Sequence, residues 1–233
     1  LKVHFPGKRK FGQPQRWIRA VDGINFDVKE GETLGLVGES GCGKSTTARA
    51  ILNLIHRAKV QGTIHLNGTR IDNLSDRAMI SHRRTVQMVF QDPFASLNPR
   101  MMVGNIIREP MANYKLFGDK TGRRLEVIRL MELVGVSPQY MNRYPHEFSG
   151  GQRQRIGIAR ALAVQPKLII CDEAVSALDV SIQAQVINLL MDLQQKLGVS
   201  YVFIAHDLAV VRHIAHRVGV MYLGKIVELA DGH

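Results

Sequence analysis

The feature that most constrains the fold is a glycine-rich segment of the pattern G-x-x-x-x-G-K-S, which runs from Gly38 to Ser45. An apolar run at 33–37 before it predicts a short buried strand, and helical periodicity follows from Lys44 to about Leu54. Backbone N–H groups of such a loop wrap phosphates, its Lys reaches the terminal phosphates and its Ser ligates Mg²⁺. The helix dipole favours an anion at this point. The segment therefore predicts an α/β nucleotide-binding fold.

A second motif, Ser149-Gly150-Gly151-Gln152, precedes a predicted helix from about Gln152 to Val164. Small residues at a helix N-terminus leave N–H groups free to bind phosphate. Many unrelated NTPases carry the first motif, but few follow it with S-G-G-Q. With both motifs, the chain resembles the nucleotide-binding subunits of ATP-binding-cassette (ABC) transporters over essentially its whole length. The resemblance implies an ATPase that uses ATP and Mg²⁺ to power transport.

Hydrophobic periodicity predicts alternating strands and helices along the chain. The predicted elements are strands at 24–28, 86–90, 167–171 and 200–205, helices at 98–135 (interrupted at 118–122) and 181–197, and hairpins at 63–68 and 218–229. The resemblance implies how they are assembled. We expect one domain over 1–233, with a P-loop NTPase, RecA-like core and an antiparallel β subdomain at about 1–90 and 165–233. A helical subdomain that carries the signature motif is expected at about 92–164.

Composition is that of an ordinary globular protein: the 233 residues are 45% hydrophobic and 22% charged. No apolar run reaches the roughly 18 residues that span a bilayer, and the first residues are not typical of a signal peptide. We therefore expect any membrane work to pass through a partner. The two cysteines, Cys42 and Cys171, have no metal-ligand spacing, which favours reduced thiols over a disulfide.

The formal net charge of +11 raises the question of a polyanionic partner. Nucleic acid is not favoured, because the basic residues are scattered and no platform of aromatic residues and arginines is visible. A basic surface that serves nucleotide and nearby anionic lipid accounts for the charge.

The first motif supplies most of the predicted nucleotide contacts. Lys44 is expected to neutralise β- and γ-phosphate oxygens, and Ser45 to ligate Mg²⁺. By resemblance, Thr46 directs its hydroxyl toward the α-phosphate, whereas Cys42 occupies a variable position and is expected to be inert. The predicted phosphate-binding positions are Gly38, Ser40, Gly41, Cys42, Gly43, Lys44, Ser45 and Thr46.

Paired carboxylates, Asp172 and Glu173, end the apolar strand predicted at 167–171. Two acids at the end of a buried strand are costly unless a cation or a function holds them there. The resemblance assigns Asp172 to the Mg²⁺ shell and Glu173 to polarising the attacking water.

Two further residues follow predicted strands, at the carboxyl ends where α/β sheets bind ligands. His206 follows the strand at 200–205, and Gln91 follows the strand at 86–90. The resemblance implies that His206 contacts the γ-phosphate, and that Gln91 touches Mg²⁺ and water and relays the nucleotide state to the membrane partner.

The signature residues Ser149, Gly150, Gly151 and Gln152 need not face this chain's own nucleotide. In the family that the chain resembles, the signature of one subunit covers the γ-phosphate bound to the other, and the loop that ends at Asp179 crosses between the two sites. The chain departs from the family in two places: Phe148 stands where Leu is most common, and Ala174 stands where many relatives have Pro.

An aromatic residue of the first β-hairpin is expected to stack on adenine, again by resemblance. Phe5 fits by its place in the opening strand, and Trp17, at the return of that hairpin, is the competing candidate. Core packing is the alternative role for either side chain.

Longer stretches around the motifs (35–47, 143–155 and 174–182) resemble the ATPases of dipeptide, oligopeptide and nickel importers, especially the F-type subunits. Glutathione, opine and oligosaccharide importers share these stretches and remain alternatives. The implied partners are a second ATPase subunit (a D-type chain or a second copy), two permeases and, indirectly, a solute-binding protein. The implied place is the cytoplasmic face of the inner membrane. A non-transport ABC ATPase is a distant alternative, and a small-molecule kinase would leave S-G-G-Q and the Asp-Glu pair without a role.

Overall fold

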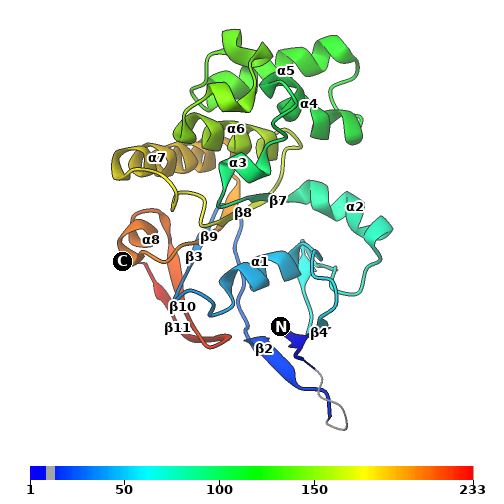
Figure 1. Ribbon diagram of the computed structural model, residues 1–233, viewed down its shortest axis with the longest axis vertical. Helices are drawn as coiled ribbons and strands as arrows, with labels where there is room; N and C mark the ends of the chain where they lie inside the picture. The colour runs from blue at the N-terminus through cyan, green and yellow to red at the C-terminus, as the bar shows by residue number, and fades with distance from the viewer. Residues whose placement is uncertain (9–13, 233) are drawn as a thin grey trace. The chain divides into compact units, whose positions relative to one another are not determined.

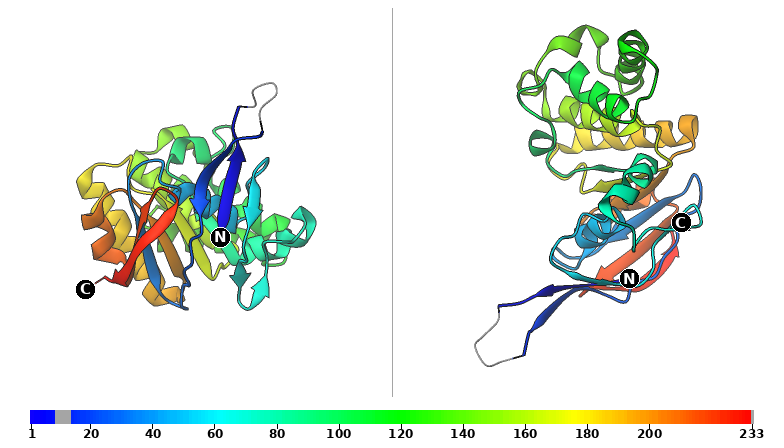
Figure 2. Two further views of the ribbon diagram at one scale, coloured as in Figure 1. Left: turned by 90° about the horizontal axis from the view of Figure 1, so that it is seen from below. Right: turned by 90° about the vertical axis from the view of Figure 1, so that its right-hand side faces the viewer.

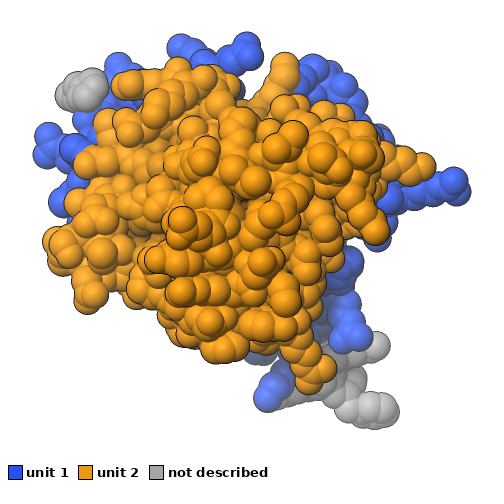
Figure 3. All heavy atoms as spheres, turned by 90° about the horizontal axis from the view of Figure 1, so that it is seen from above, with its two compact units in different colours: residues 1–83, 201–233 blue, residues 84–200 orange. Residues whose placement is uncertain are grey.

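The computed structural model describes residues 1–8 and 14–232. The chain divides into two compact units, which are coloured separately in Figure 3. The first unit contains residues 1–83 and 201–233, and the second contains residues 84–200. The division into a core and a helical subdomain at 92–164 remains a prediction.

Parallel strands form the centre of the first unit (Figure 1). β3 (Thr33–Val37) pairs in parallel with β10 (Arg217–Tyr222) on one side and with β9 (Ser200–Ile204) on the other. β11 (Lys225–Asp231) adds antiparallel to β10, so the order is β11-β10-β3-β9. Every residue of β3 and β9 is buried, which explains why these strands are continuous apolar runs.

Two helices of the first unit directly follow strands of this sheet along the chain. α1 (Lys44–Ile51) follows β3 through the glycine-rich loop, and α8 (Leu208–Ile214) follows β9. α8 packs so closely on β3 that a Cβ atom at Gly35 would lie 2.1 Å from the side chain of Val211. The strand-loop-helix order predicted for the nucleotide site is therefore present.

An antiparallel sheet forms the other part of the first unit. Its order is β2-β1-β4, with strands β1 (Lys2–Pro6), β2 (Trp17–Asp22) and β4 (Lys59–Gln61). The β1–β2 hairpin, drawn in blue, is seen along its length in Figure 2. The predicted Asn67-Gly68 hairpin is present as β5 (His65–Leu66) and β6 (Thr69–Arg70). The helix α2 (Asp76–Thr85), which leads along the chain to the second unit, was not predicted.

The predicted strand at 24–28 is wrong. Burial does alternate there, since Ile24 is buried, Asn25 exposed and Phe26 half-buried, but the segment belongs to no strand. The backbone N–H and carbonyl of Ile24 are both hydrogen-bonded to Leu1. An extended segment can thus show a period of two without a neighbouring strand.

The second unit combines two parallel strands with several helices. β7 (Val86–Val89) pairs in parallel with β8 (Leu168–Asp172). The remaining elements are α3 (Pro93–Ser96), α4 (Val103–Asn113), α5 (Lys120–Leu133), the 3₁₀ turns η1 (Pro138–Asn142) and η2 (Pro145–Glu147), α6 (Gly150–Leu162) and α7 (Val180–Leu197). The helical break spans residues 114–119, so it starts and ends earlier than the predicted 118–122; Asp119 caps α5, and Gly122 lies inside its first turn. None of the helices in the described part of the chain is long and apolar enough to cross a membrane.

Candidate functional site

The glycine-rich loop takes a shape that side chains at two positions would prevent. Gly38 and Gly43 have φ values of 151° and 111°, which residues with a side chain rarely adopt. A Cβ atom at Gly38 would lie 2.2 Å from the carbonyl oxygen of Met221, and one at Gly43 would lie 2.3 Å from the carbonyl oxygen of Ala20. The loop is therefore closed in by backbone on two sides, as a tight phosphate cradle requires.

The N-terminus of α1 is suited to an anion. No side-chain hydrogen bond caps the helix at Gly43, and no acidic residue lies in its first turn. The Lys44 side chain is held over the loop, because its Nζ donates to the carbonyl oxygens of Gly38 (2.6 Å) and Glu39 (2.9 Å). An ammonium group, the first-turn amides of the helix and its dipole thus favour negative charge at one place.

The predicted neighbours of Lys44 lie in this loop or in the first turn of α1. Ser45 and Thr46 are half-exposed. Cys42 is buried, and its carbonyl oxygen accepts a hydrogen bond from the Gly224 amide at 2.9 Å. The Cys42 sulfur lies 3.7 Å from Lys44 Nζ, and the inert role expected for this residue stays a prediction.

Glu173 and Gln91 are brought together in the second unit. The Gln91 side-chain Nε2 donates to Glu173 Oε2 at 2.7 Å, although 82 positions separate the two residues. Glu173 has a φ of 50°, an uncommon value for a residue with a side chain. Its carbonyl oxygen accepts from the Ser176 hydroxyl at 2.9 Å. Strained backbone held by specific hydrogen bonds is frequent at functional sites.

The residues before Glu173 are buried. Asp172 is 6% exposed at the end of β8, and Cys171 is fully buried. Burial, and to a smaller extent the negative charge of Asp172, raise the pKa of the Cys171 thiol to about 12. Cys171 therefore stays a protonated, unreactive thiol, and it is not a disulfide partner in this structure.

The signature residues Ser149–Gln152 form the start of α6. Two of their four backbone amides are engaged in hydrogen bonds within the motif itself. The Gln152 amide donates to Ser149 Oγ (3.3 Å), and the Ser149 amide donates to Gln152 Oε1 (3.0 Å), which is a capping box. Because the amides of Ser149 and Gln152 are engaged in this capping box, the predicted free N–H groups of the motif are those of Gly150 and Gly151. A Cβ atom at Gly151 would lie 2.5 Å from Ile182 of α7, so this glycine is also required for helix packing.

Asp179 and His206 lie at positions that the sequence predicted. Asp179 is exposed immediately before α7, where it makes no side-chain capping bond. His206 is exposed directly after β9, and the next residue, Asp207, caps α8 by accepting from the Ala209 amide at 2.8 Å. His206 therefore precedes a helix that is already capped.

The two adenine candidates point to opposite faces of the first hairpin. Phe5 is paired with Ile18 and Trp17 with Pro6, and partners in an antiparallel pair share a face. Phe5 shares its face of β1 with the fully buried Val3. Trp17 lies on the other face and is 46% exposed.

Sequence reasoning missed one contact pair near Gln91. The guanidinium of Arg153 lies 3.4 Å from the ring centroid of Phe94, and it donates to the carbonyl oxygen of Phe148 at 2.6 Å. Phe94 is 59% exposed on α3. The amino-acid sequence contains no pattern that indicates this contact, because Phe94 and Arg153 are far apart along the chain.

The predicted site residues fall on both units. The first unit holds Phe5, Gly38–Thr46 and His206, and the second holds Gln91, Ser149–Gln152, Asp172, Glu173 and Asp179. Within the second unit, Gln91 and Glu173 are joined directly. In the described residues no cluster of three His, Cys, Asp or Glu side chains is spaced for a metal ion.

Comparison with known families decides between the ABC ATPases and the alternatives. Residues 21–176 match the family described as ABC transporter. The chain belongs to this family. It is therefore an ATPase of the ABC type, and the alternative of a small-molecule kinase is excluded.

Relatives of this ABC ATPase extend the match beyond the family region. The chain is 56% identical to the oligopeptide transport ATP-binding protein OppF of Escherichia coli (strain K12), over 98% of the chain and 69% of OppF. It is 57% identical to the glutathione import ATP-binding protein GsiA of Salmonella paratyphi A, over 94% of the chain and 35% of GsiA.

Solved structures confirm the predicted fold class. The dimeric, post-hydrolysis structure of the ATP-binding cassette MJ0796 bound to ADP and Pi superposes with a TM-score of 0.85 at 27% identity, over 100% of this chain and 98% of that chain. The P-loop core, the antiparallel sheet and the helical segment with the signature thus form an ABC ATPase fold.

Proposed function

We propose that this chain is the ATP-hydrolysing subunit of an importer that takes up peptides through a membrane permease. The observation that carries the proposal is the 56% identity to an oligopeptide transport protein over nearly the whole chain. The 57% identity to a glutathione import protein keeps a second solute in view, and glutathione is itself a small peptide. These relatives do not favour uptake of nickel, opines or oligosaccharides.

The solute is tested with the assembled transporter in proteoliposomes. We expect ATP hydrolysis to rise when the cognate solute-binding protein carries a di- or oligopeptide, because substrate-loaded binding protein favours the hydrolysing state. Empty binding protein is the control, and glutathione and nickel complexes are run in parallel. Stimulation by a non-peptide solute alone would contradict the proposal.

Phosphate binding is assigned to the loop and to the start of α1. Lys44 neutralises the β- and γ-phosphates, Ser45 ligates Mg²⁺, and Thr46 reaches the α-phosphate. The uncapped N-terminus of α1 supports this assignment, because its amides and dipole favour an anion. Phe5 is proposed to stack on adenine, because it is half-buried in the opening strand and its cross-strand partner Ile18 is exposed, which leaves this part of its face open.

Hydrolysis is assigned to the carboxylates and to two residues that follow strands. Ser45, Gln91 and, through water, Asp172 would hold Mg²⁺, and the bound ion would neutralise charge on the phosphates. Glu173 polarises the attacking water, and the 2.7 Å hydrogen bond from Gln91 supports the role by fixing the orientation of the Glu173 carboxylate. His206 contacts the γ-phosphate.

The signature is assigned to a nucleotide held by a second subunit. The amides of Gly150 and Gly151 face that γ-phosphate, and Asp179 lies in the loop that passes between the two sites. The dimeric state of the MJ0796 structure supports a head-to-tail pair. We propose a D-type ATPase chain as the partner, with a second copy of this chain as the alternative, and a peripheral location on the cytoplasmic face of the membrane beside two permeases.

Replacing Lys44 by Ala is expected to weaken Mg-ATP binding by roughly tenfold or more. The change removes a charge-assisted contact to phosphate, typically about 1.5–3 kcal/mol. Calorimetric titration with Mg-ATP measures the effect. Lys59→Ala is the matched control, because Lys59 is an exposed lysine of β4 in the same unit. Equal affinities for the two variants would contradict the role of the loop.

A further inference from the structure

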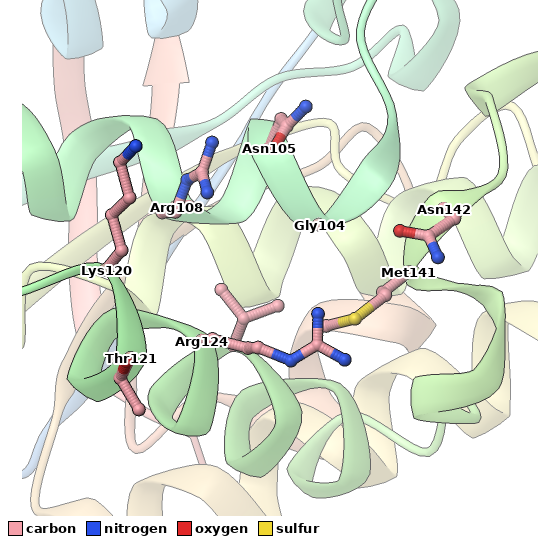
Figure 4. A pocket seen from close by; sticks show the side chains of 9 residues that line it. Gly104, Asn105, Arg108, Lys120, Thr121, Arg124, Met141 and Asn142 are labelled. Atoms are coloured by element: carbon pink, nitrogen blue, oxygen red, sulfur yellow. The ribbon is translucent and has the colours of Figure 1, made fainter.

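The second unit contains a hollow of about 270 Å³ that is lined by basic and polar side chains (Figure 4). It lies between α4, the first turns of α5 and the end of η1. Arg108 of α4 and Lys120 and Arg124 of α5 supply three positive charges. The polar residues of the lining are Asn105, Thr121 and Asn142, and no acidic residue belongs to it.

The walls of this basic pocket are fixed by backbone contacts. The Val103 amide at the start of α4 donates to the carbonyl oxygen of Arg143, just after η1, at 2.9 Å. The connection to α5 is held by Arg123, which donates to the carbonyl oxygens of Leu116 (2.9 Å) and Gly118 (2.7 Å). Val127 is buried in the lining. The pocket is therefore part of the packed fold.

The three cations of the pocket differ from their neighbours on α5. Among the described residues, Arg108, Lys120 and Arg124 make no side-chain hydrogen bond or ion pair. Outside the pocket, Arg129 pairs with Glu126 at 2.6 Å. Asp119, the residue before Lys120, already accepts from the Gly122 amide at 2.9 Å. Three unneutralised charges in one hollow repel one another, and an anion bound between them removes that repulsion.

We propose that the basic pocket is a second anion site, which binds a phosphate-bearing ligand independently of the nucleotide site. Arginines bind phosphate through two parallel hydrogen bonds, and lysine adds a point charge. The side-chain amides of Asn105 and Asn142 and the Thr121 hydroxyl supply neutral donors, which favour an oxyanion over chloride. Sites for drug-sized ligands usually occupy about 300–1,000 Å³, so the ligand is a small phosphate ester or the headgroup of an anionic phospholipid.

The soluble arm of the test uses pyrophosphate and the full-length, ¹⁵N-labelled chain. We expect saturable chemical-shift changes at the Thr121 backbone amide and at the side-chain amides of Asn105 and Asn142. The phosphate-loop signals are followed separately. Arg124→Gln should weaken the pocket's affinity by roughly tenfold, the usual effect of one charge-assisted hydrogen bond, and added salt should weaken it further. Lys120→Gln, at an exposed position, provides a second variant whose spectrum also reports on folding.

The lipid arm uses co-sedimentation with phosphatidylglycerol vesicles, with phosphatidylcholine vesicles as the uncharged reference. Lys196→Gln is the matched control in both arms, because Lys196 is an exposed lysine in the last turn of α7. If pyrophosphate binding is saturable, and Arg124→Gln weakens it whereas Lys196→Gln does not, the ligand is a soluble phosphate compound. If the double variant Arg108→Gln/Arg124→Gln reduces vesicle binding whereas Lys196→Gln does not, the ligand is a lipid headgroup. If neither arm distinguishes the pocket variants from Lys196→Gln, the proposal is wrong.

Discussion

Replacing Glu173 by Gln is expected to leave ATP binding intact and to slow hydrolysis by roughly 10²–10⁴-fold, the usual contribution of a positioned catalytic base. The change removes the negative charge that polarises the attacking water but keeps the size and shape of the side chain. A glutamine at this position still offers an oxygen to Gln91 Nε2, which now donates to Glu173 Oε2 at 2.7 Å. The variant therefore separates the chemistry of the carboxylate from its structural contact.

Steady-state hydrolysis by the assembled transporter and calorimetric binding of Mg-ATP measure the two effects. Glu132→Gln is the matched control, since Glu132 is an exposed carboxylate on α5 and its loss changes the net charge equally. Near-wild-type turnover of the Glu173 variant would overturn the assignment. Loss of ATP binding together with hydrolysis would instead show that Glu173 holds the site together.

Mixing two inactive variants is expected to restore hydrolysis if the signature acts on a partner's nucleotide. In a homodimeric preparation, Lys44→Ala removes the lysine contact to the phosphates, and Ser149→Arg places a bulky side chain at the start of α6. A mixed dimer then combines the intact loop of one chain with the intact signature of the other. Random mixing into a two-fold dimer leaves about a quarter of the sites complete. If the signature served its own chain, the mixture would stay inactive.

The heteromeric case needs a different comparison. A chain that carries both changes, paired with a wild-type D-type partner, should lose hydrolysis at both sites, because the partner's nucleotide then lacks its signature. Ser149→Ala is the control for helix stability, since loss of an N-cap by itself costs about 1 kcal/mol. Half-maximal activity of the doubly changed chain would contradict a signature that acts between subunits.

Local sequence patterns predicted the parts of the site that depend on local geometry. The phosphate loop follows a buried strand and begins a helix, and Glu173 and His206 follow strands, as their positions indicated. The family assignment followed from two short motifs. These features were predictable because a strand, a turn or a helix start is specified by adjacent residues.

Contacts between distant residues were not predictable in this way. The signature motif predicts that Gly151 supplies a free amide, yet its lack of a side chain also makes room for Ile182 of α7. Burial alternates at 24–28 with the period of a strand, but the backbone of Ile24 is hydrogen-bonded to Leu1 and not to a neighbouring strand. The left-handed backbone of Glu173 likewise depends on packing around it, since glutamate has no local preference for that conformation.

The phosphate loop is shaped as much by its surroundings as by its own residues. The carbonyl oxygens of Ala20 and Met221 come within 2.3 Å and 2.2 Å of where Cβ atoms at Gly43 and Gly38 would lie. A sequence could thus keep every letter of the motif and still lose the loop, if β2 or β10 shifted. Grafting these eight residues into another protein would therefore require β2 and β10 as well, because the backbone of these two strands confines the loop.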